Sequence, residues 1–220
     1  MSIIQFQDEQ GVRIITINRP DKRNALNLEM YTRLTEYLIQ GESDNGINAF
    51  LLKGAGDCFT SGNDIADFLK NSDLGPNHPT CKFLFTLLDL TKPLVAAVTG
   101  PAVGIGTTLL LHCDLVYADN TAKFQLPFID LALVPEAGAS LLLPRLVGQT
   151  KANELLLLGE PFDAQSAQAM GLINQTLPHD ELMNHALAQS IKLAQKPPQA
   201  LKISRQLIRG DKALIKEQML

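Results

Sequence analysis

The chain has 220 residues, of which 45% are hydrophobic, so it is long enough for one domain with a sizeable core. Its net charge is −4 and its basic residues are scattered, which argues against nucleic acid as a partner. The three cysteines show neither metal-ligand spacing nor a disulfide framework, and the N-terminus carries no signal-peptide pattern. We therefore expect a cytoplasmic protein with no metal site.

The N-terminal part of the chain predicts a strand, a helix and a second strand. Val12–Ile17 is rich in β-branched residues, which favour a strand. The apolar residues of 28–38 share one helical face, and Asn27 before them is a suitable N-cap. The apolar run at 49–52 predicts the next strand.

The middle of the chain predicts a polar loop over 71–80 and then a helix that ends near residue 91. The uncharged stretch 94–111 is long enough to cross a bilayer, but proline, glycine and threonine interrupt it. A buried strand at 94–98, a turn and a buried helix from about Gly104 explain it better. The strand is apolar throughout rather than alternating, which indicates burial on both faces.

The rest of the chain predicts short strands at 115–118 and 122–125, and a helical pattern from Ala137 onward. Strands and helices that alternate first, with helices later, indicate an α/β domain followed by a helical region.

Two glycine-containing turns, Phe59–Asp64 and Gly100–Gly106, are the most informative feature of the sequence. Each follows a buried strand and would leave a backbone N–H free, on Asn63 in the first turn and on Ile105 in the second. Two such groups aimed at one point form an oxyanion hole, which stabilises charge on a carbonyl oxygen. Either turn alone is equally compatible with ordinary turn chemistry or close packing. A dinucleotide site is disfavoured because the third glycine of its fingerprint is missing.

Together, the two turns resemble the crotonase (enoyl-CoA hydratase/isomerase) superfamily. The resemblance extends over residues 3–210 and rests on these segments: Arg19–Leu26, Phe59–Ile65, Thr99–Gly106, Cys113–Ala118 and Ala164–Ile173. It implies a ClpP/crotonase-type core of ββα superhelical units in residues 1–195. It also implies that residues 196–220 begin a C-terminal helical region, which we expect to be truncated.

The resemblance further implies an acyl-CoA substrate whose thioester oxygen is held by the N–H groups of Asn63 and Ile105. Coenzyme A would enter as part of the substrate, with no permanently bound cofactor. The family pattern places substrate contacts at these further positions: Ala25, Leu26, Gly62, Asp64, Ile65, Gly104 and Phe128. It also implies a homotrimer or a dimer of trimers, without nucleic acid or membrane partners.

The catalytic residues implied by the resemblance favour isomerisation over hydration. Thr108 and Phe128 occupy the positions of the two hydratase glutamates, and neither can act as a base near neutral pH. Leu133–Gly138 instead resembles the segment of peroxisomal-type Δ3,Δ2-enoyl-CoA isomerases in which a glutamate, here Glu136, is the sole acid/base. Such an enzyme converts a 3-enoyl-CoA into the 2-enoyl-CoA through a dienolate.

Three alternatives remain open. Glu136 could simply open a helix, where the dipole would lower its pKa and burial would raise it. Asp64 or Asp130 could serve a hydratase or another crotonase reaction, although Asp64 is also suited to stabilising its own turn. The chain could also be a non-catalytic acyl-CoA-binding protein that kept the fold and lost the chemistry.

Overall fold

The computed structural model describes residues 2–64, 66–67 and 75–219. Its main sheet has six strands in the order β1-β2-β3-β4-β6-β9. β1 and β2 are antiparallel, and every other neighbouring pair is parallel. The strands are β1 (Ile4–Glu9), β2 (Val12–Ile17), β3 (Ala49–Gly54), β4 (Leu94–Val98), β6 (Leu115–Asp119) and β9 (Gln175–Leu177).

A smaller sheet of three strands has the order β5-β7-β8, in which β5 pairs with β7 in parallel and β8 with β7 antiparallel. Its strands are β5 (Pro101–Val103), β7 (Lys123–Gln125) and β8 (Phe162–Asp163). Two residues separate β4 from β5, and one residue separates β5 from α4. The second glycine turn therefore lies where the two sheets meet.

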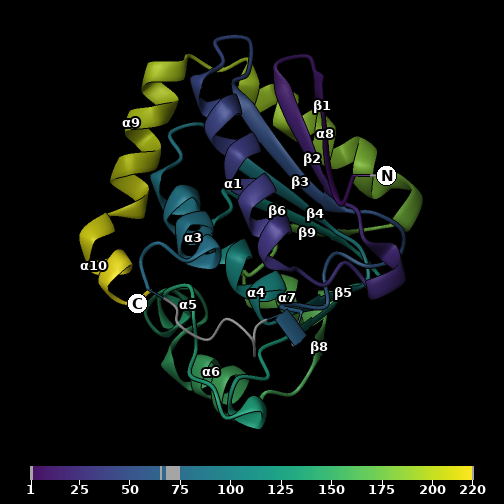
Figure 1. Ribbon diagram of the computed structural model, residues 1–220, viewed down its shortest axis with the longest axis vertical. Coiled ribbons are helices and arrows are strands. Elements are labelled where there is room, and N and C mark those ends of the chain that lie inside the picture. Colours follow the sequence, from purple (N-terminus) through teal and green to yellow (C-terminus); the bar gives the residue numbers. More distant parts are fainter. Residues whose placement is uncertain (1, 65, 68–74, 220) are drawn as a thin grey trace.

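Helices cover both faces of the main sheet, with α1 and α3 on one face and α8 on the other (Figure 1). The longer helices are α1 (Leu28–Ser43), α3 (Pro79–Asp89), α5 (Ala139–Val147), α8 (His179–Ala194) and α9 (Pro198–Arg209). Shorter ones are α4 (Ile105–Thr108), α6 (Gln149–Asn153), α7 (Ala164–Ala169) and α10 (Lys212–Glu217). Single turns are η1 (Pro20–Lys22), η2 (Leu109–His112), η3 (Ile129–Leu131) and η4 (Glu154–Leu158).

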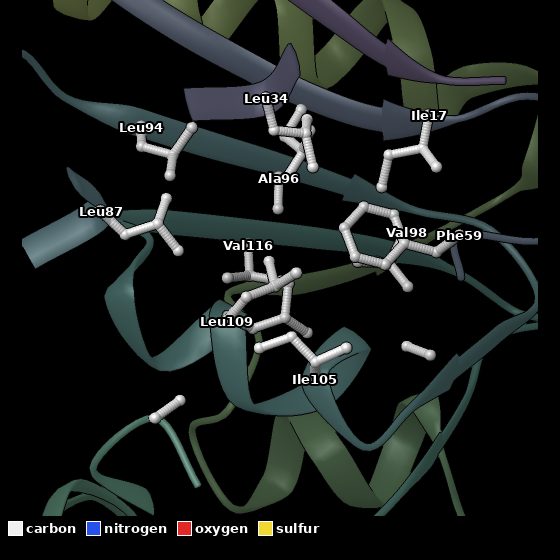
Figure 2. Packing of buried hydrophobic residues seen from close by; sticks show 14 of the residues in the cluster. Ile17, Leu34, Phe59, Leu87, Leu94, Ala96, Val98, Ile105, Leu109 and Val116 are labelled. Atoms are coloured by element: carbon white, nitrogen blue, oxygen red, sulfur yellow. The ribbon is translucent and has the colours of Figure 1, made fainter. Parts of the chain in front are cut away.

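The core explains why β4 is apolar throughout. Leu94, Ala96 and Val98 face the cluster that contains α1 and α3, whereas Val95 and Ala97 face the cluster under α8. Successive strand residues point to opposite faces, so a strand covered on both sides has no polar position. Figure 2 shows the first of these clusters between the strands and α4. The predicted burial on both faces is confirmed.

Several predicted elements are confirmed, including the strand at Val12–Ile17 and the helix capped by Asn27, whose side chain accepts a hydrogen bond from Met30 N. The predicted loop over 71–80 is wrong at its end, because α3 begins at Pro79 with His78 as its cap. Residues 71–74 of that loop lie outside the described residues.

The expectation of helices alone after Ala137 is also wrong, because β8 and β9 lie in this region. They have two and three residues, too few to show the period-two alternation by which strands are predicted. Residues 198–217 contain α9 and α10. Across the described part of the chain, no helix combines the length and apolar character that a membrane crossing requires.

Candidate active site

The two glycine turns lie directly against each other. Thr60 forms a parallel bridge with Ala102, and Val103 N donates a 3.0 Å hydrogen bond to Thr60 O. A Cβ on Gly62 would lie 2.9 Å from Val103 O, and one on Gly106 would lie 2.7 Å from Thr60 Cγ2. Glycine is therefore required at both positions for the turns to approach this closely. The structure confirms that these two segments, some forty residues apart, form one unit.

Asn63 lies on an extended segment that pairs with Leu26. This bridge uses Leu26 N, which donates to Gly62 O at 2.8 Å, and Asp64 N, which donates to Leu26 O at 2.8 Å. Successive N–H groups of an extended chain point to opposite sides, so the Asn63 N–H points away from this bridge. That orientation is what the predicted oxyanion role requires.

The Asn63 side chain is held by a second element. The hydroxyl of Tyr31, on the buried face of α1, donates a short hydrogen bond to Asn63 Oδ1. Tyr31 is 1% exposed, and its ring packs against Phe83 of α3 with centroids 5.5 Å apart. Sequence periodicity identified Tyr31 only as a core residue of the helix. A tyrosine on a buried helix face needs a hydrogen-bond partner for its hydroxyl group. That requirement is the only indication in the sequence that Tyr31 contacts a polar residue.

Ile105 is the first residue of α4, directly after Gly104 with φ +55° and ψ −116°. Thr108 N donates to Gly104 O at 3.0 Å, whereas the N–H of a residue this early in a helix has no acceptor within it. The Ile105 side chain points into the core toward the sheet residues Val98 and Val116 (Figure 2). A Cβ on Gly104 would meet nothing within 4 Å, so open space lies beside this turn.

Glu136 precedes a sharp reversal of the chain. Ala137 and Gly138 both have positive φ, at +54° and +69°, and α5 begins only at Ala139. The alternative in which Glu136 opens a helix is therefore wrong. Left-handed backbone costs a non-glycine residue about 1–2 kcal/mol, so the conformation of Ala137 needs support from its surroundings.

The carboxyl group of Glu136 is buried. Among the described residues, its Oε1 has no hydrogen-bond partner. Burial raises the pKa of Glu136 to about 7, from an ordinary value of 4.5. Burial is also the main cause of the raised pKa values of Tyr31 and Cys81, and the charge of Glu136 raises both further. The carboxyl group therefore lies near Tyr31, which itself contacts Asn63.

His112 is a packed core residue, 3% exposed. Its Nε2 lies 2.8 Å from Ala137 O, and since a carbonyl can only accept, Nε2–H is the donor. Burial lowers the pKa of His112 to about 4, so the ring is neutral at physiological pH. Local sequence patterns do not reveal this contact, because 25 residues separate the two partners.

Asp64 is held in an ion pair with Arg19. Its carboxylate lies 2.7 Å from Arg19 Nη1 and accepts a bond from Ala66 N. The hydrogen bond from Arg19 lowers the pKa of Asp64, which makes it a weaker base. The same Arg19 group donates to Ala25 O at 3.1 Å, so Ala25 and Asp64 lie together. This agrees with the interpretation that Asp64 stabilises its own turn.

The other candidate positions are dispersed. Thr108 is fully buried and, among the described residues, its Oγ1 has no partner. Phe128 is buried in a separate cluster with Ala139 and Leu143, and Asp130 is exposed on η3. Ile65 lies outside the described residues. Within the described part of the chain, no three His, Cys, Asp or Glu side chains come together as a metal site would require.

Comparison with known proteins identifies the family. The model of the enoyl-CoA hydratase/isomerase family matches residues 7–218. The chain belongs to this family. A family structure from Pseudoalteromonas atlantica T6c, an enoyl-CoA hydratase/isomerase, superposes with a TM-score of 0.95 at 41% identity, covering 99% of this chain and 87% of that one. The crotonase-type fold expected from the resemblance is thus confirmed.

Family relatives carry names for more than one reaction. The chain is 38% identical to Enoyl-CoA delta isomerase 2 of Rattus norvegicus, over 94% of this chain but 54% of the relative. It therefore spans about half the length of that protein. It is 35% identical to 2,3-dehydroadipyl-CoA hydratase of Escherichia coli K12, over 95% of this chain and 82% of the relative. Family membership alone therefore does not choose between isomerisation and hydration.

Proposed function

We propose that this protein isomerises a 3-enoyl-CoA to the conjugated 2-enoyl-CoA, with Glu136 as the only acid/base. One observation carries the proposal: the carboxyl group of Glu136 has a buried oxygen, Oε1, without a hydrogen-bond partner among the described residues, and burial raises its pKa to about 7. A general base works best when its pKa lies near the operating pH. At such a pKa both protonation states are populated near neutral pH, so this carboxyl group can both accept and return a proton.

In the proposed reaction, the thioester oxygen accepts hydrogen bonds from the N–H groups of Asn63 and Ile105. Glu136 removes a proton from C2, and the electron pair delocalises over C2–C4 and onto the oxygen as a dienolate. The same carboxyl group returns the proton to C4, so the double bond moves from C3–C4 to C2–C3. The two N–H groups stabilise the charge that develops on oxygen, and no co-reactant is consumed. The open space beside Gly104 leaves room for the acyl group.

Hydration is the less favoured reaction because the chain lacks the acid/base pair that it needs. Thr108 cannot act as a base near neutral pH, and Phe128 cannot transfer protons. Asp64 is paired with Arg19, which lowers its pKa, so it is a poor substitute. The remaining carboxylate considered, Asp130, is exposed to solvent on η3.

Incubation with a 3-enoyl-CoA tests the proposal through the absorbance of the conjugated thioester. We expect turnover by the wild type and a loss of about 10²–10⁴-fold in kcat for Glu136→Gln, which keeps the shape and removes the base. Asp130→Asn, which removes an exposed carboxylate, keeps wild-type activity.

Other results would assign the site differently. An active Glu136→Gln variant would place the base elsewhere. Water addition to a 2-enoyl-CoA, without isomerisation, would make the protein a hydratase. Binding of the thioester without turnover of either substrate would make it an acyl-CoA-binding protein.

A further inference from the structure

We infer that His112 is a positioning residue that holds Glu136 in place through the carbonyl group of the next residue, an inference that rests on the proposed function. It does not touch the reacting atoms. It acts through one hydrogen bond, from its Nε2–H to Ala137 O at 2.8 Å.

The backbone around Glu136 helps to direct its carboxyl group. Its Oε1 has no hydrogen-bond partner among the described residues. The side chain must nevertheless reach both C2 and C4 of the substrate. Its direction is therefore set by the backbone at residues 136–138, where Ala137 and Gly138 adopt left-handed conformations. The Ala137 carbonyl ties this reversal to η2 through the hydrogen bond from His112.

The backbone of His112 is held in place as well. His112 ends η2, and its own carbonyl accepts a 2.5 Å bond from Arg209 of α9. Arg209 also pairs with Asp114 at 3.2 Å, and Asp114 Oδ2 accepts a 2.8 Å bond from Leu94 N at the start of β4. A continuous set of hydrogen bonds thus runs from the main sheet and α9 through His112 to the Glu136 turn.

Charge is not the means by which His112 acts. Burial holds its pKa at about 4, and nearby Arg209 also disfavours the protonated ring. The neutral ring donates from Nε2 at every pH at which the enzyme would work, so it presents the carbonyl with a fixed donor. The titratable groups around Glu136 itself are Tyr31 and Cys81, whose own pKa values are raised.

Two substitutions of matched size separate the hydrogen bond from simple packing. His112→Gln places an amide N–H where Nε2 lies, whereas His112→Met has nearly the same length and shape but no donor. We expect His112→Met to lower kcat by up to about 10²-fold with little change in KM, because the base is misplaced while binding groups stay. His112→Gln is expected to keep most of the wild-type kcat. Equal kcat values in the two variants would overturn the inference.

A second measurement decides the inference even if the protein does not isomerise 3-enoyl-CoA. ¹³C NMR of protein labelled at the glutamate carboxyl carbon, with Glu136→Gln for assignment, follows the titration of Glu136 directly. We expect a pKa near 7 in the wild type and His112→Gln, and a value closer to the ordinary one in His112→Met. An unchanged pKa in His112→Met would overturn the positioning role. If His112→Met fails to fold, His112→Asn replaces it, because its shorter amide cannot reach the carbonyl.

Discussion

The defining residue of the site is a carboxyl group kept in an environment that disfavours its charged form. Burial raises the pKa of Glu136 to about 7, whereas the unfolded chain has the ordinary value of 4.5. Between these two values, the folded protein binds more protons than the unfolded one. The contribution of Glu136 to the free energy of unfolding therefore falls as the pH rises from about 4.5 through 7. The raised pKa that suits Glu136 to proton transfer thus lowers the stability of the folded protein at neutral pH.

Replacing Glu136 should make the protein more stable at alkaline pH. Glu136→Gln has no charge to bury, so its stability advantage over the wild type should grow between pH 4.5 and 7, by up to roughly 3 kcal/mol. Urea unfolding at pH 5 and pH 8 measures this difference. The exposed Glu160 provides the control, since Glu160→Gln should follow the wild-type pH dependence. A wild type whose stability advantage over Glu136→Gln increases with pH would contradict the burial of this carboxyl group.

Single residues also show how far the sequence could predict the site. The motif could single out Asn63, Ile105 and Glu136 as candidates, because backbone turns and a Pro-Glu-Ala-Gly segment are local features of the sequence. The contacts of Tyr31 and His112 could not be predicted in this way, since their partners lie 32 and 25 residues away in the sequence. The raised pKa of Glu136 also required the structure, because burial and the helix dipole act in opposite directions and only burial applies here.

At the scale of elements, the two turns are held together by close backbone contact. Gly62, Gly104 and Gly148 all have positive φ, so alanine is strained at each of them. They differ in their surroundings: a Cβ on Gly62 would lie 2.9 Å from Val103 O, whereas one on Gly104 or Gly148 would meet nothing within 4 Å. Gly148 lies between α5 and α6.

Three alanine substitutions should therefore have distinct effects. Gly104→Ala and Gly148→Ala should each cost about 1–2 kcal/mol of stability from backbone strain, and Gly62→Ala should cost more because the turns must separate. Only Gly104→Ala, of the two milder variants, should lose activity, since its methyl group enters the space proposed for the acyl group. Urea unfolding and kcat/KM for the 3-enoyl-CoA measure both properties. Equal activities of Gly104→Ala and Gly148→Ala would contradict the placement of the substrate.

The elements themselves were predictable where their pattern was long enough. β2 has the predicted bounds and α1 begins at the predicted residue, although it continues to Ser43, because a β-branched run and a capped amphipathic pattern are strong local signals. β8 and β9 were missed because such short strands exist only through their partners, β7 and β6. The same holds for β1, whose single buried residue, Ile4, leaves no alternation to detect.

At the scale of the whole molecule, apolar side chains are left uncovered beside the segment that carries Glu136. Leu131 is 54% exposed, Val134 80%, and Leu157 and Leu158 59% and 60%. η3 and η4, which carry three of these residues, are in contact, so we call Leu131, Leu157 and Leu158 the η3–η4 patch. Exposed apolar patches of this kind mark interaction surfaces. We propose that the patch contributes to a homotrimer, or to a pair of trimers.

Light scattering coupled to size-exclusion chromatography tests this assembly. We expect a mass three or six times that of the 24.0 kDa chain. Leu157→Asp with Leu158→Asp should reduce it to that of one chain, because buried, unpaired carboxylates are costly at an interface. Ile39→Asp, which alters an equally exposed apolar residue on α1, should leave the mass unchanged. A wild-type protein with the mass of a single chain would contradict the proposal.

The order of strands in the main sheet has a consequence for how the chain can be made. Beginning at β1, each strand in space is also the next of that sheet along the sequence, through β2, β3, β4, β6 and β9. During synthesis from the N-terminus, every new strand can therefore dock onto the edge left by its predecessor, without waiting for a later segment to be inserted between them. Nascent chains halted on the ribosome at successive lengths would carry a partial sheet of growing width. The edge opposite β1 would move from strand to strand until β9 is added as the last edge strand.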